Sequence, residues 1–119
     1  MSDYNGWTNY ETWAVNLWMG NDSGSYDWAT ALAFEAWKDA KATTILTRSE
    51  EARYRLASYL KDHFGNEENC PLLGEANVYT DLLNAALSEV NWQEIAGAWL
   101  KQDELLKPDD GDEAYQPTA

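Results

Sequence analysis

Carboxylates are the main side chains in this chain that could do chemistry, accompanied by one histidine and one cysteine. Glu67 and Glu68 are adjacent and could serve as general acid and base, but that role needs a pocket that raises one pKa. His63 falls on the apolar face of a predicted helix, where a structural role is favoured. Cys70 directly precedes Pro71 and has no basic neighbour that would lower the thiol pKa. We therefore expect no enzymatic activity and predict no catalytic residue.

The acidic run at 109–113, DDGDE, has the composition of a calcium loop but not its spacing. An EF-hand loop needs oxygen ligands at positions 1, 3 and 5 before a glycine at position 6. With Gly111 at position 6, Leu106 and Pro108 would occupy positions 1 and 3. The sequence predicts no metal site and no cofactor.

Net charge is the most informative bulk property, because 21 acids against 8 Lys and Arg give −13 at pH 7. This charge disfavours direct nucleic-acid binding and attraction to anionic membranes. The acids are also unevenly distributed: residues 1–59 hold 8 acids and 5 bases, whereas residues 60–119 hold 13 acids and 3 bases. Closely spaced carboxylates on a helical scaffold can imitate a duplex, which carries one charge per ~1.7 Å of axis. The alternative is that acidity only keeps the protein soluble.

The first element that would position these groups is a helix near the N-terminus. Thr8 and Glu11 have the spacing of a capping box, so Thr8 is predicted as the N-cap of a helix that ends at Gly20. The helix carries apolar residues at helical spacing, which predicts that they face the core. This stripe consists of Tyr10, Trp13, Ala14, Leu17 and Trp18.

Four more helices are predicted from the same kind of pattern. Ser25, Thr47 and Asn91 are the expected N-caps of the second, third and fifth, and Thr47 and Asn91 are each followed by a Glu three residues later. Gly65 is expected to end the third helix, and the fourth is expected to begin near residue 76. Their apolar stripes run, in chain order, from Ala29 to Ala40, Ala52 to His63, Tyr79 to Val90 and Trp92 to Leu100.

The fold class that follows is all-α, a compact single-domain bundle of about five helices over residues 1–106. Residues 66–75, NEENCPLLGE, form the longest predicted loop. Residues 107–119 are almost free of apolar side chains and should be a disordered acidic tail. A single cysteine excludes an internal disulfide, and we find neither a signal peptide nor a membrane span, so we expect the cytoplasm of the host cell.

The block GWTNYETW at 6–13 resembles the N-terminal signature of a family of small, largely uncharacterised proteins encoded by phages, plasmids and prokaryotic genomes. The stretch VNWQEIA at 90–96 is similar to that family's second helix-start element. The resemblance implies no catalytic residue. It does imply a setting, because small acidic proteins of mobile elements often disable host defence by occupying the nucleic-acid channel of a restriction or CRISPR effector.

Together these observations predict an acidic interaction module that inhibits a host nucleic-acid-binding defence complex by presenting carboxylates to its basic surface. Trp7 is the aromatic residue expected to contact a partner, since it precedes the predicted cap and lacks an apolar staple partner. The predicted partner-binding residues are Glu67, Glu68, Glu75, Asp81, Glu89, Asp103, Glu104 and Trp7.

The alternative is a structural or accessory protein that self-associates, as a homodimer for instance, through exposed aromatics such as Trp7 and Trp28. A third interpretation is a hydrolase that uses Glu67 or Glu68.

Overall fold

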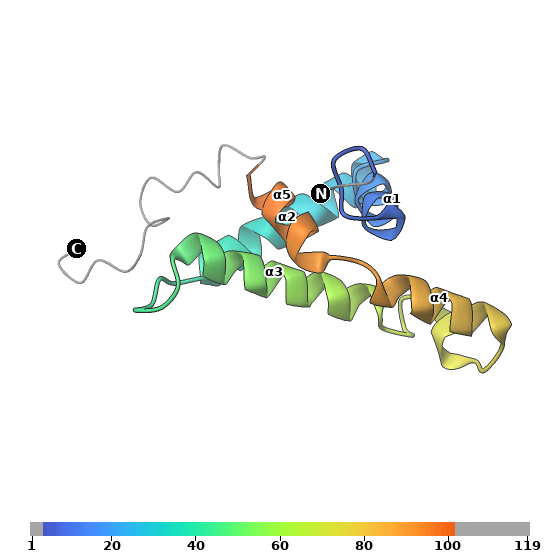
Figure 1. Cartoon of the computed structure of the whole chain (residues 1–119). Coiled ribbons are helices and arrows are strands. Elements are labelled where there is room, and N and C mark those ends of the chain that lie inside the picture. The colour runs from blue at the N-terminus through green and yellow to red at the C-terminus, as the bar shows by residue number, and fades with distance from the viewer. Residues whose placement is uncertain (1–3, 102–119) are drawn as a thin grey trace.

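The computed structural model describes residues 4–101 and is drawn in Figure 1. This part of the chain forms five α-helices and a short 3-10 helix without any strand, which confirms the all-α class. None of its helices is long and apolar enough to cross a membrane. The expected tail at 107–119 lies outside the described residues. The elements are α1 (Tyr10–Met19), α2 (Ser23–Asp39), α3 (Arg48–Phe64), η1 (Pro71–Gly74), α4 (Val78–Ser88) and α5 (Trp92–Leu100).

The core lies where α2, α3 and α5 pack against one another. Leu56 and Leu60 of α3 and Ile95 of α5 are fully buried there. The buried face of α2 is mostly alanine, and small side chains at a contact allow helix axes to approach closely. For these three helices the predicted apolar stripes are confirmed as the buried faces.

The start of α3 is the capping box that the sequence predicts. The Thr47 hydroxyl accepts from the Glu50 N–H at 3.0 Å, and Glu50 Oε1 accepts from the Thr47 N–H at 2.9 Å. At the other end, Gly65 is the C-cap, and its N–H bonds to the carbonyl of Lys61 at 3.0 Å. Both predicted ends of this helix are therefore confirmed.

Three other helices begin at residues that the sequence analysis missed. Asn9 caps α1 in place of Thr8, Asp22 caps α2 in place of Ser25, and Asn77 caps α4. In each case the side-chain oxygen accepts from a backbone N–H three residues later, at 2.8 to 3.0 Å. Asn and Asp are at least as good N-caps as Ser and Thr, so a neighbouring Thr or Ser with the right spacing was a misleading signal.

The predicted burial of the α1 stripe is wrong. Tyr10, Leu17 and Trp18 are exposed, whereas Thr12 and Met19, on the opposite side of the helix, are buried. Hydrogen bonds explain this orientation, because a buried indole N–H needs an acceptor. The Trp99 Nε1–H of the core donates to Asn16 Oδ1 on α1 at 2.7 Å. Polar contacts thus fix the inner face of α1, and its aromatic face points outward.

The stripe of α4 is also mostly outside the core. Tyr79 and Leu82 are 68% and 64% exposed, so their predicted burial is wrong, and Val78, which is not part of the predicted stripe, is 60% exposed. Among the other elements α4 packs mainly against η1, and Figure 1 shows it beyond the end of α3, away from the crossing of α2, α3 and α5. Helical periodicity identified a helix with an apolar face, but no described element covers that face.

Candidate functional site

The two helix-start elements at 6–13 and 90–96 are joined to each other by hydrogen bonds. Thr12, which is fully buried, stands at their centre. Its hydroxyl donates to Asn9 Oδ1 at 2.6 Å and accepts from the Asn91 N–H at 2.8 Å. Because Asn9 and Asn91 are the N-caps of α1 and α5, one hydroxyl links the starts of two helices that lie far apart in the sequence.

Two further bonds strengthen the same junction. The Thr8 N–H donates to Glu94 Oε1 at 3.1 Å, and Asn9 Nδ2 donates to the carbonyl oxygen of Glu89 at 2.7 Å. Thr8 is not the N-cap of α1, which is Asn9. The carboxylate of Glu94 accepts from the Thr8 N–H instead of from the N–H of the residue that caps its own helix. These polar side chains hold the fold together, so their conspicuous pattern has a structural explanation.

Trp7 has a structural explanation of the same kind. It follows a tight turn in which Asn5 and Gly6 have φ of 48° and 94°, and Tyr4 and Trp7 exchange backbone hydrogen bonds across the turn. An Asn-Gly pair is the usual signal for such a turn, and the sequence analysis did not use it. The Trp7 side chain is half-buried and packs against the core. Its contact with a partner stays a prediction, but a partner is no longer needed to account for it.

Five of the seven predicted carboxylates lie on one segment, residues 66–89, which we call the acidic arm. It comprises the loop after α3, η1 and α4. No Lys or Arg occurs between Asp62 and Leu100, so the arm carries no compensating side-chain cation of its own. Asp103 and Glu104 lie outside the described residues. The acids of the arm are all exposed: Glu67, Glu68, Glu75, Asp81 and Glu89.

The arm is held together mainly by its own contacts. The buried hydroxyl of Thr80 on α4 donates to the carbonyl of Leu72 in η1 at 2.6 Å. At the loop, the carboxylate of Glu67 lies against Gly74, where a Cβ would come within 2.5 Å of Glu67 Oε1. The Glu67 carboxylate thus lies beside the residue that precedes Glu75.

The apolar part of the arm is the feature that the sequence analysis missed. The side chains of Val78, Tyr79 and Leu82 are exposed on the same segment as the five acids, and Leu72 of η1 is 47% exposed. No residue type distinguishes this stripe from the core stripes of the other helices. An exposed apolar group surrounded by charge is typical of a protein contact surface.

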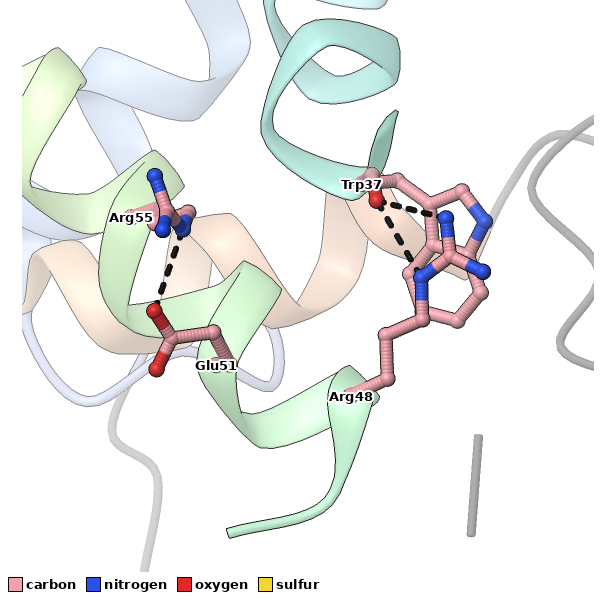
Figure 2. A network of polar contacts seen from close by, with 4 residues as sticks. All are labelled: Trp37, Arg48, Glu51 and Arg55. Atoms are coloured by element: carbon pink, nitrogen blue, oxygen red, sulfur yellow. Dashed lines mark hydrogen bonds and ion pairs between the residues drawn. The ribbon is translucent and has the colours of Figure 1, made fainter. Parts of the chain in front are cut away.

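Cations of the first half are engaged in contacts within the fold (Figure 2). Arg48 donates to the carbonyl oxygen of Trp37 through Nε at 3.3 Å and Nη2 at 2.9 Å, and its guanidinium lies 4.1 Å from the centre of the Trp37 ring. Arg55 Nε donates to Glu51 at 3.1 Å. A hydrogen bond to Tyr59, together with Glu51, raises the Arg55 pKa. Arg48 thus ties the start of α3 to the end of α2, and Arg55 joins successive turns of α3.

His63 lies among aromatic rings beside a hollow of about 390 Å³, which Trp18 and Met19 also line. The centres of the Trp28 and Phe64 rings are 4.4 and 5.1 Å from the imidazole. Partial burial lowers the His63 pKa. Asn69 Nδ2 stands 3.3 Å from Nδ1, and an amide donor there requires that nitrogen to be an acceptor. The lowered pKa and this contact both favour the neutral imidazole.

This environment makes the stability of the protein depend on pH. The unfolded chain has a histidine pKa of about 6.5, so below that pH it binds more protons than the folded chain does. Stability is therefore complete above about pH 6.5 and falls as the pH drops toward the lower pKa of the folded state. Urea midpoints measured between about pH 7.5 and 5 should show this loss. His63 is the only histidine, so His63→Gln should reduce the dependence of the urea midpoint on pH. An equal dependence in the variant would show that His63 is not its source.

Within the described residues, no three His, Cys, Asp or Glu side chains are grouped in a way that could hold a metal ion. Cys70 is half-buried at the start of η1. Glu67 and Glu68 are both exposed, and neither lines the hollow beside His63. The described residues of the acidic arm present charge and exposed apolar side chains.

Comparison with known proteins places the chain in a family. No curated protein and no solved structure matches it. Residues 1–106 match a family whose description is "family of unknown function (DUF7249)", and this range includes both helix-start elements and the acidic arm. The chain therefore belongs to the family of unknown function DUF7249.

Proposed function

We propose that this protein is an acidic interaction module of a mobile genetic element, active in the host cytoplasm. In this proposal the acidic arm binds the basic surface of a nucleic-acid-binding defence complex, of the restriction or CRISPR type, and thereby inhibits it. The observation that carries the proposal is the segment from Asp62 to Leu100, which contains seven acids and neither Lys nor Arg.

The charge of the acidic arm supports a nucleic-acid-binding protein as the class of partner. A segment with carboxylates and no side-chain cation is attracted to the basic grooves that bind phosphate backbones. The exposure of all five acids on the arm leaves them available to such a groove. An acidic coat that served only for solubility would need no segregation of acids and bases along the chain.

The apolar side chains supply what charge alone does not. Electrostatic attraction sets the rate and the specificity of association, while buried aromatic and aliphatic anchors carry most of the binding free energy. Tyr79 and Leu82 are two thirds exposed on the same helix as Asp81. An arm with both properties is suited to a groove that has basic walls and an apolar floor.

The setting comes from the sequence. The blocks at 6–13 and 90–96 resemble a family found in phages, plasmids and prokaryotic genomes, and the chain is a member of DUF7249 over residues 1–106. A small acidic protein encoded by such an element gains most from blocking a nucleic-acid-handling defence enzyme. The candidate partners are therefore effectors with a nucleic-acid channel.

Charge reversal tests the proposal. The triple variant Glu67→Lys, Glu68→Lys, Glu75→Lys should weaken binding to the target effector by at least about tenfold, because each reversal replaces an attraction by a repulsion. Binding of the wild type should also weaken steadily as salt rises. Affinities would be measured by biolayer interferometry against a panel of purified restriction endonucleases and CRISPR effectors.

A matched control separates the arm from net charge. The variant Asp27→Lys, Glu35→Lys, Asp39→Lys changes net charge equally, at exposed positions of α2, and should retain binding. Equal losses in both variants would show that only the overall charge matters. The proposal would be wrong if, for every effector that binds the protein, the affinity changed neither with salt concentration nor in the triple variant of the arm.

A further inference from the structure

The outward face of α1 is a cluster of aromatic and aliphatic side chains, which we call the aromatic face: Tyr4, Tyr10, Trp13, Leu17 and Trp18. Tyr4, Tyr10, Leu17 and Trp18 are 43%, 51%, 44% and 64% exposed. The rings of Tyr4 and Tyr10 meet edge to face with centres 5.4 Å apart, and both lie against Trp13, at 6.4 and 5.5 Å. The rings therefore support one another and present a preformed surface.

The fold fixes this face toward the outside. Thr12 and Asn16, on the other side of α1, are held by hydrogen bonds to Asn91 and to the indole of Trp99. Rotating the helix to bury its aromatic residues would break both bonds and leave the donor groups of Asn91 and Trp99 without their partners. No described element covers Tyr10, Leu17 or Trp18 to the extent of burying them.

The aromatic face differs from the acidic arm in its charge. Between Tyr4 and Asn21 the only ionisable side chain with a formal charge at neutral pH is Glu11. In a chain of net charge −13, most surfaces would set carboxylates against carboxylates if two copies met. The aromatic face carries fewer carboxylates than the acidic arm, so that repulsion is weaker on it, and without Lys or Arg it has no attraction for an anionic partner or lipid headgroup.

We propose that the aromatic face binds the same face of a second copy of this chain, forming a two-fold symmetric dimer. A symmetric contact places each patch against itself, and a neutral, ring-rich patch is compatible with this arrangement. The contact is separate from the acidic arm and does not depend on the function proposed above. The dimer would present two arms, so that an effector with two basic sites could be bound bivalently.

The exposed area sets the expected strength. With roughly 150–250 Å² per aromatic side chain, the exposed fractions of Tyr4, Tyr10, Leu17 and Trp18 amount to about 400 Å². That lies in the range of functional patches on monomers. Two copies would bury about 800 Å² from these side chains, below the ~1,200 Å² of stable interfaces. The dimer should therefore be weak, with a dissociation constant on the order of 100 µM.

Sedimentation equilibrium from about 10 µM to 1 mM tests this. The weight-average mass of the wild type should rise from monomer toward dimer, and the variant Tyr10→Glu, Leu17→Glu should weaken association at least about tenfold, since it brings carboxylates together across the symmetry axis. The control Tyr79→Glu, Leu82→Glu alters the same residue types on α4, which are more exposed, and adds the same charge. It should change association less than about twofold.

A second measurement needs no variant. In the wild type, the indole N–H resonances of Trp13 and Trp18 should shift on dilution, whereas that of Trp99, which is bonded to Asn16 inside the fold, should not. Salt distinguishes the two proposals, because screening of the net charge should strengthen the dimer while it weakens binding of the arm. Each proposal can therefore fail without the other.

Three results would overturn the dimer. The first is a monomer at about 1 mM, well above the expected dissociation constant. The second is a loss of association in the α4 control as large as that in the α1 variant, which would assign the contact to α4 or to net charge. The third is flotation of the monomer with phosphatidylcholine vesicles, which would assign the aromatic face to a lipid surface.

Discussion

Replacing Leu60 by Ala should lower the free energy of unfolding by about 2–5 kcal/mol, the range for truncation of a buried leucine. Leu60 is fully buried on α3, where α2 and α5 both pack. The same substitution at Leu82, which is 64% exposed on α4, should change stability by no more than about 0.5 kcal/mol. Urea denaturation of the two variants and the wild type measures both effects.

The comparison tests where the core ends. Both residues belong to stripes of helical period, and both substitutions remove the same atoms from a helix. A loss at Leu82 similar to the loss at Leu60 would show that α4 is packed into the core, and the exposed apolar face of the acidic arm would no longer exist. A small loss at Leu60 would contradict the three-helix core itself.

Replacing Thr12 by Val should cost about 1–3 kcal/mol, although the two side chains have nearly the same shape. The change removes the hydroxyl that accepts from the Asn91 N–H and donates to Asn9, and leaves a partly buried N–H without its partner. Thermal or urea unfolding gives the magnitude. Faster hydrogen exchange of the Asn91 amide would locate the effect at the junction.

Thr12→Ser is the matched variant, because it keeps the hydroxyl and loses one methyl group. It should be less destabilising than Thr12→Val. If serine were the worse of the two, the methyl group and not the hydrogen bonds would hold α1 to α5, and the structural explanation for the two helix-start elements would be wrong.

Hydrophobic periodicity was enough to predict α2, α3 and α5 and their buried faces. The same periodicity located α1 and α4 but did not predict which of their side chains are buried. The period of a stripe identifies a helix with an apolar face, but it does not show whether another element covers that face. For α1 the deciding groups are polar: Asn16 and Thr12 accept hydrogen bonds from residues more than 75 positions away. Pairings of that kind leave no signature in a single local segment.

The candidate site was predictable in charge but not in its apolar part. The excess of acids over bases in the second half is visible in the sequence, and it directs attention to residues 66–89. The exposure of Tyr79 and Leu82 depends on the position of α4 beyond α3, which is a property of the fold. The tryptophan and tyrosine side chains near the N-terminus are predicted to face the core, yet many of them form the aromatic face.

The central claim is that the acidic arm occupies the surface where an effector binds nucleic acid, and a competition experiment tests it most directly. The effector that binds the labelled protein would be titrated with an unlabelled DNA or RNA duplex that it recognises, with fluorescence anisotropy as the readout. We expect the duplex to displace the protein completely. In the converse titration, the arm-reversal variant should fail to displace the duplex. A ternary complex in which the effector holds both ligands at once would contradict the claim.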